Sequence, residues 1–220
     1  MTALAADRRN TLQRRIRWIV AVTIGYNLIE AIVAITAGSI ASSGALVAFG
    51  LDSTIEVLSA AAVAWQFTRH DPQRWERHTL RVIAMAFFTL AAYVITASLL
   101  ALIGRVEAQH STMGIIITVL SVIIMPFLSL AERRAGRELG SATAVADSKQ
   151  TLICTYLSAA VLIGLLLNTW FDWWWADAIA GLVIALFAFR EGIEAWRGDA
   201  CATSVGMLLE DEHDDHHDHD

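Results

Sequence analysis

The sequence predicts an all-α integral membrane protein with six transmembrane helices, and three observations support this class. Hydrophobic residues make up 56% of the 220 residues, and the mean hydropathy is positive, at +0.52. Several runs reach the roughly 20 apolar residues that a helix needs to cross a bilayer. Arginines are concentrated between these runs, as they are in the cytoplasmic loops of membrane proteins. We therefore expect a multi-pass protein of the cell membrane.

The predicted spans follow one another with short connections. Each is an apolar run bounded by charged or turn-forming residues, and they cover residues 18–37, 44–67, 82–103, 113–131, 142–167 and 174–196. The expected organisation is a basic N-terminus (1–17), a transmembrane domain (18–198) and an acidic tail (199–220). The first run suits a signal peptide in part, but it continues into Glu30 without a convincing cleavage signal, so a retained helix is expected.

The distribution of positive charge predicts the orientation of the chain. Arginines precede the first span and occupy the loops after the second and fourth spans, whereas the odd-numbered loops hold only Arg105. Because cytoplasmic loops carry an excess of Lys and Arg, both termini are expected in the cytoplasm. The formal net charge of −6 hides this pattern, since residues 210–220 alone supply seven of the 22 acidic residues.

Two carboxylates, Asp52 and Glu56, lie one helical turn apart near the middle of the second span. An acidic side chain at the centre of a spanning helix costs about 2.5–3.5 kcal/mol on insertion scales. No Arg or Lys lies within this run. The pair therefore predicts a protein-lined or watery cavity and a cation that neutralises it. A structural alternative is a protonated carboxyl hydrogen-bonded to Tyr26 or Asn27.

The fifth span carries a polar face at a matching depth. Its members recur at spacings of three, four and seven, which places them on one side of a helix: Asp147, Gln150, Thr151, Cys154 and Ser158. With a rise of about 1.5 Å per residue, Gln150 and Cys154 overlap the acid pair in depth, because the two spans run in opposite directions. Small and polar residues also serve simple helix packing, and this alternative stays open.

At these residues the chain resembles the transmembrane domain of the cation diffusion facilitator family, also called the cation efflux family. The segment GSIASSGALVAFGLDSTIEVLS (38–59) contains an acidic pair that matches the family's Asp-x-x-x-Asp pattern. The segment ADSKQTLIC (146–154) is similar to its Ala-Asp-x-x-His-x-x-x-Asp pattern, and residues 176–196 resemble its sixth helix. The resemblance implies a tetrahedral divalent-metal site between spans two and five, proton-coupled export from the cytoplasm, and homodimers.

Matched position by position, the resemblance implies four metal ligands: Asp52, Glu56, Gln150 and Cys154. The family's histidine falls on Gln150 and its span-five aspartate on Cys154. Two carboxylates and a thiolate supply three anionic ligands, and sulfur favours Zn²⁺ over Mg²⁺, Ca²⁺ or Mn²⁺. Zn²⁺ is thus the expected ion, as cargo and not as a permanent cofactor. Competition between protons and metal for these ligands is the physical basis of antiport.

Several other polar residues have two interpretations each. Glu30 is either a packing residue or a relay that lines the cavity, and Asp147 is either an entry ligand or an acid that suits a helix N-terminus. Family members commonly carry a cytoplasmic metal-binding domain after span six, and here it is expected to be absent. The tail is expected to be disordered, and either binds metal loosely or is only a solvated acidic segment. Its histidines are His213, His216, His217 and His219.

These observations predict a secondary transporter that exports a divalent cation. The alternative is an accessory or sensing membrane protein that binds the ion without moving it. An enzyme is not expected, because an intramembrane aspartyl hydrolase needs acids on two facing helices, whereas Asp52 and Glu56 share one helix. The expected partners are a divalent metal ion, the lipid bilayer and a second copy of the chain, with no nucleic acid.

Overall fold

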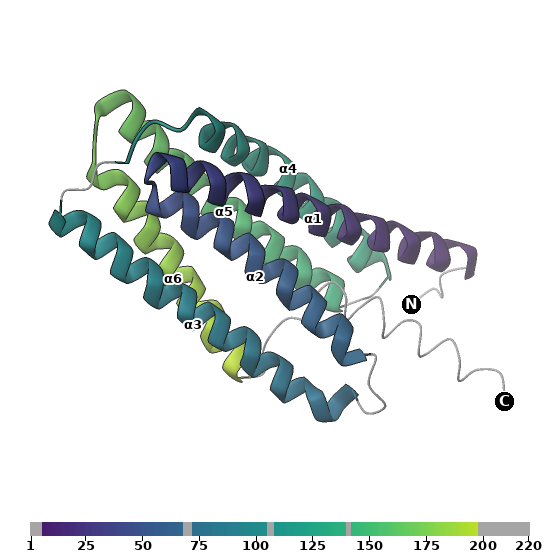
Figure 1. Ribbon diagram of the computed structural model, residues 1–220. Coiled ribbons are helices and arrows are strands. Elements are labelled where there is room, and N and C mark those ends of the chain that lie inside the picture. The colour runs from purple at the N-terminus through teal and green to yellow at the C-terminus, as the bar shows by residue number, and fades with distance from the viewer. Residues whose placement is uncertain (1–5, 68–71, 105–107, 140–141, 198–220) are drawn as a thin grey trace.

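The computed structural model describes residues 6–67, 72–104, 108–139 and 142–197 and is a bundle of six α-helices, with no strand among these residues. The helices are α1 (Ala6–Ala41), α2 (Gly44–Phe67), α3 (Pro72–Gly104), α4 (Thr112–Leu139), α5 (Ala142–Phe171) and α6 (Trp175–Arg197). Successive helices run in opposite directions, so that α1 begins and α6 ends toward the same end of the bundle (Figure 1). The predicted all-α fold of six helices is confirmed.

Several helices extend beyond the predicted spans at the end where α1 begins. α1 starts at Ala6 instead of residue 18, α3 starts at Pro72 instead of residue 82, and α4 continues to Leu139 instead of ending at residue 131. Backbone hydrogen bonds continue a helix past the hydrocarbon region, where charged side chains can reach water. With its 36 residues, α1 is about 54 Å long and exceeds the roughly 30 Å hydrocarbon core.

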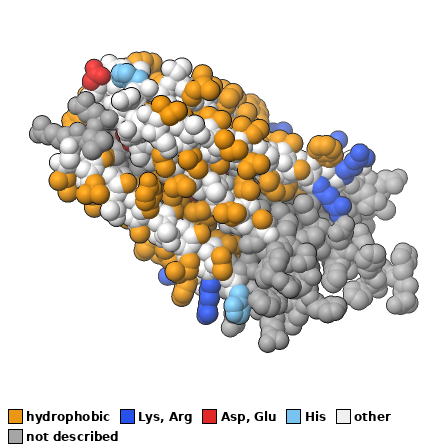
Figure 2. All heavy atoms as spheres, in the orientation of Figure 1, with side chains coloured by type: hydrophobic (Ala, Val, Ile, Leu, Met, Phe, Trp, Pro, Cys, Tyr) orange, Lys and Arg blue, Asp and Glu red, His pale blue; other side chains and the backbone are white. Residues whose placement is uncertain are grey.

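Four of the described helices are long and apolar enough to cross a membrane, over Arg14–Ala41, Leu80–Gly104, Thr112–Glu138 and Thr151–Phe171. Large apolar side chains on these helices face outward, and Leu100, Ile103 and Phe127 are each more than 60% exposed. Figure 2 shows apolar side chains across the middle of one face and Lys or Arg side chains toward the end where α1 begins. The chain is therefore a multi-pass membrane protein. That this end is cytoplasmic stays a prediction.

Helix α2 lies in the interior of the bundle, where it contacts α1, α3, α5 and α6. Its close approach to α1 requires a residue without a side chain, because a Cβ atom at Gly50 would lie 2.8 Å from the backbone nitrogen of Ile35. Small residues drive such packing in lipid, where the hydrophobic effect does not favour contact between helices. The tight crossing brings Asn27 of α1 against Glu56 of α2, and Glu30 of α1 against Ser53 of α2.

One end of α2 is fixed by a residue far away in the sequence. Asp177 of α6 is 6% exposed and accepts hydrogen bonds from Ser43 Oγ at 2.5 Å and from the backbone nitrogen of Ala45 at 3.3 Å. A carboxylate at this position satisfies backbone donors of the first helical turn and complements the positive end of the helix dipole. Asp177 therefore caps α2 across the bundle.

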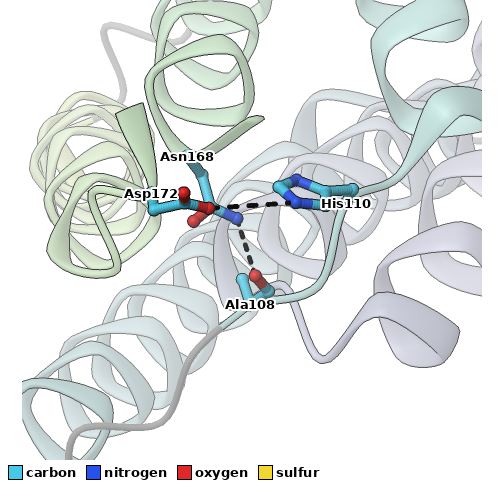
Figure 3. A network of polar contacts seen from close by, with 4 residues as sticks. All are labelled: Ala108, His110, Asn168 and Asp172. Carbon is cyan, nitrogen blue, oxygen red and sulfur yellow. Dashed lines mark hydrogen bonds and ion pairs between the residues drawn. The ribbon is translucent and has the colours of Figure 1, made fainter. Parts of the chain in front are cut away.

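Residues 108–110, which precede α4, are attached to the end of α5 (Figure 3). Asn168 Nδ2 donates a hydrogen bond to the backbone oxygen of Ala108 at 2.6 Å, and both residues are buried. His110 Nε2 lies 4.0 Å from Asp172 Oδ1, but these side chains are 59% and 90% exposed. The buried hydrogen bond from the Asn168 side chain therefore stabilises this connection more than the solvent-exposed ion pair does.

Candidate metal centre

The structure brings Asp52, Glu56 and Cys154 together inside the bundle. One possible ligand atom of each residue lies within 4.8 Å of the other two. The two carboxylates stand one turn apart on α2, and Cys154 faces them from α5. A tetrahedral ion with ligand bonds of about 2.0–2.3 Å holds its ligands roughly 3.5 Å apart. Small side-chain rotations therefore suffice to arrange these three groups around one cation.

Asp52 is the most isolated of the three groups. Its side chain is 6% exposed, and within the described residues no hydrogen bond to its carboxylate is found. A buried carboxylate without donors must be neutralised by a proton or by a cation, because apolar surroundings cannot solvate its charge. The position next to a second acid and a thiol makes Asp52 suited to a metal ion.

Glu56 links three helices. One of its oxygens, Oε1, lies 2.6 Å from Cys154 Sγ of α5, which donates to it, and the other, Oε2, accepts a hydrogen bond of 2.6 Å from Asn27 Nδ2 of α1. Sequence reasoning named Asn27 only as a partner of a protonated acid. Its place beside the site follows from the tight α1–α2 connection, since Asn27 and Glu56 each lie roughly 20 Å along their helices from that turn.

Glu30 belongs to a neighbouring polar cluster. It is 1% exposed, accepts a hydrogen bond from Ser53 Oγ at 2.7 Å, and accepts another from Ser121 Oγ of α4. The hydroxyl of Tyr26 lies 2.7 Å from Ser121 Oγ. Glu30 thus lies beside the candidate metal ligands, connected through Ser53, the residue that follows Asp52. Its predicted role as a relay stays a prediction.

The remaining predicted residues are only partly covered by the structure. Gln150 and Asp147 are helical residues of α5, but their side chains lie outside the described part of the chain. Thr151, Cys154 and Ser158, the other members of the predicted polar face, are all buried. The tail residues His213, His216, His217 and His219 lie outside the described residues. The roles of the tail, Gln150 and Asp147 therefore stay predictions.

Two carboxylates and a thiol enclosed by largely apolar helices define a class, namely multi-pass membrane proteins with a candidate divalent-metal site. The chain belongs to the cation efflux family. A family model for the cation efflux transmembrane domain matches residues 20–197. That range contains Asp52, Glu56 and Cys154 as well as the neighbouring Asn27 and Glu30, so the whole described site lies within the family domain.

Individual relatives are distant in sequence. The cation-efflux pump FieF of Shewanella oneidensis is 28% identical over 114 residues, which are 52% of this chain and 36% of the pump. Transmembrane protein 163 of Xenopus laevis is 22% identical over 200 residues, 88% of this chain and 70% of that protein. Protein p34 of Rickettsia prowazekii is 24% identical over 198 residues, 86% of this chain and 65% of that protein. The match to the pump therefore spans about a third of its length.

Proposed function

We propose that this protein is a secondary transporter that exports a divalent cation from the cytoplasm in exchange for protons. One observation carries the proposal: possible ligand atoms of Asp52, Glu56 and Cys154 converge between α2 and α5, where Asp52 and Cys154 are buried and Glu56 is half-buried. Membership of the cation efflux family supports movement of a cation across the membrane, as does the similarity to the cation-efflux pump FieF of Shewanella oneidensis.

Zn²⁺ is the proposed cargo because of the donor set. Mg²⁺, Ca²⁺ and Mn²⁺ prefer shells made only of oxygen, whereas the thiolate of Cys154 suits Zn²⁺ and chemically similar ions such as Cd²⁺. Two carboxylates and one thiolate also carry more negative charge than a monovalent ion would neutralise. The site therefore favours a divalent ion that accepts both sulfur and oxygen.

Proton exchange follows from the chemistry of the same three groups. Each must lose its proton to bind metal, and each can take up a proton again when the metal leaves. Metal and protons thus compete for one set of atoms. A proton gradient can drive metal movement if the site is exposed alternately to the two sides of the membrane.

Orientation and assembly form the rest of the proposal. The exposed arginines Arg14, Arg15 and Arg17 of α1 and Arg134 and Arg137 of α4 favour a cytoplasmic location for that end of the bundle. A homodimer rests on the family resemblance. Cross-linking in lipid bilayers that yields only monomer would remove the dimer from the proposal without affecting the metal site.

Reconstitution of the purified full-length chain into liposomes tests the proposal. We expect an imposed pH gradient to drive movement of Zn²⁺ and Cd²⁺ more strongly than that of Mn²⁺ or Mg²⁺. Liposomes with the double variant Asp52→Asn/Glu56→Gln at equal protein density provide the control. Binding of an ion without any flux would instead support the accessory interpretation, and loss of neither binding nor flux in the double variant would refute the site.

A further inference from the structure

We propose that Asn27 of α1 supplies a further ligand to the transported cation through its side-chain oxygen, Oδ1. This inference rests on the proposed function, because it concerns the same site. Neither α1 nor an amide oxygen belongs to the set of carboxylates and thiol that the structure brings together. A ligand from α1 would make the site one that joins three helices, α1, α2 and α5.

The geometry of Asn27 carries the inference. The residue is 5% exposed, and its Nδ2 donates a hydrogen bond of 2.6 Å to Glu56 Oε2. Its Oδ1 is buried and has no hydrogen-bond partner within the described residues. Since Oδ1 and Nδ2 are bonded to the same carbon, Oδ1 lies within about 5 Å of the Glu56 carboxylate. This separation is comparable to that among the three candidate ligand atoms.

The chemistry of an unpaired amide oxygen points to a cation. Buried carbonyl oxygens in proteins nearly always have a donor, so an amide oxygen without one, next to Glu56, requires an explanation. Because Oδ1 lies within about 5 Å of the Glu56 carboxylate, a positive ion bound to Glu56 on that side would lie within reach of the amide oxygen. The neutral oxygen would complete a four-ligand shell without adding a fourth negative charge, in the place that the family pattern gives to Gln150.

The nitrogen and the oxygen of the Asn27 amide have separate roles in this arrangement. Nδ2 holds Glu56 in place through a hydrogen bond, whereas Oδ1 contacts the ion. Assignment of oxygen and nitrogen in an amide follows its hydrogen-bond partners, and only the nitrogen can donate to the carboxylate of Glu56. A substitution that keeps an oxygen but removes the N–H group therefore separates the two roles.

Binding of Co²⁺ as a probe for Zn²⁺ tests the inference, because its absorption spectrum reports directly on the ligands. We expect Asn27→Ala to weaken Co²⁺ binding about tenfold or more and to change the spectrum. Asn27→Asp keeps an oxygen ligand, so its affinity should stay within about threefold of the wild type with an altered spectrum. Asn168→Ala removes an equally buried amide whose partner is the backbone of Ala108, and it should change neither measurement.

The outcomes separate this inference from the proposed function. If wild-type protein binds Co²⁺ and Asp52→Asn abolishes binding, but Asn27→Ala matches the wild type in affinity and spectrum, Asn27 is not a ligand and the proposed function stands. If Asn27→Asp weakens binding as much as Asn27→Ala, an oxygen at this position contributes nothing to binding, which also overturns the inference. If the wild type binds no Co²⁺, the proposed site itself is wrong. Should Asn27→Ala not fold, Asn27→Asp decides.

Discussion

Asp52 and Asp177 are equally buried, at 6% exposure, yet their surroundings are opposite. Asp177 accepts hydrogen bonds from Ser43 and from the backbone of Ala45, at the positive end of the α2 dipole. Asp52 lies beside Glu56 and Cys154, and no described residue donates to it. Burial of a carboxylate therefore does not by itself define a binding site. The distinguishing feature is whether described residues donate hydrogen bonds to the carboxylate.

The largest expected effect is a difference in Zn²⁺ binding and transport when each of these two aspartates is replaced by asparagine. Asp52→Asn should lower Zn²⁺ binding and transport at least about 100-fold, because it removes an anionic ligand. Asp177→Asn should leave Zn²⁺ affinity within about threefold of the wild type, because its carboxylate binds protein donors only. Metal titration and proteoliposome uptake, with insertion checked for each variant, provide the measurement. Full activity of Asp52→Asn would contradict the proposal that Asp52, unlike Asp177, binds the metal ion.

Substitutions of Cys154 test whether its thiol is a metal ligand and sets the ion selectivity of the site. Cys154→Ser removes the soft, ionisable donor at nearly the same size, so Zn²⁺ and Cd²⁺ affinity should fall about tenfold more than Mn²⁺ affinity. Cys154→Asp restores a third anionic ligand and should retain transport with selectivity shifted toward harder ions. Uptake of the same ion panel by both variants tests this. Equal Zn²⁺ affinity in the wild type and Cys154→Ser would show that Cys154 is a packing residue and not a metal ligand.

The effects of the two substitutions on stability should be reversed: Asp177→Asn should destabilise the protein more than Asp52→Asn. Asp177→Asn weakens the hydrogen bonds that cap α2 and should lower the free energy of unfolding by about 1–3 kcal/mol. Asp52→Asn replaces a buried acid to which no described residue donates a hydrogen bond, so the metal-free variant should be as stable as the wild type or more stable. Thermal unfolding in detergent with a chelator present measures both. A lower Tm for Asp52→Asn than for Asp177→Asn would contradict the assignment of roles.

The smallest effect on transport is expected from deletion of the acidic tail. Deletion of residues 210–220 should raise the half-saturating Zn²⁺ concentration about twofold to threefold and leave the maximal flux nearly unchanged, because loose ligands raise only the local concentration. A variant with alanine at His213, His216, His217 and His219 keeps the acidic charge and separates imidazole binding from electrostatic attraction. A large fall in maximal flux would assign the tail a role in transport itself.

Local sequence features predicted much of the fold and part of the site. Apolar runs predicted each helix, although charged flanking turns such as those before Trp18 extended α1 beyond its run. The four-residue spacing of Asp52 and Glu56 predicted that both would face the same side, and depth counted along antiparallel helices predicted that Cys154 would meet them. The donors around these residues were harder to predict, because several polar residues lie at similar depth.

The sequence by itself determined the membrane-spanning helices, the buried acid pair and the family, because hydropathy, helical periodicity and short motifs are properties of neighbouring residues. Only the tertiary structure decided that Asn27 contacts Glu56, that Glu30 bonds Ser53 and Ser121, and that Asp177 caps a helix that begins at Gly44. In lipid, an apolar helix face gains little by turning inward, so contacts between helices depend on close packing at small residues such as Gly50. That packing depends on the shapes of all the neighbouring helices together.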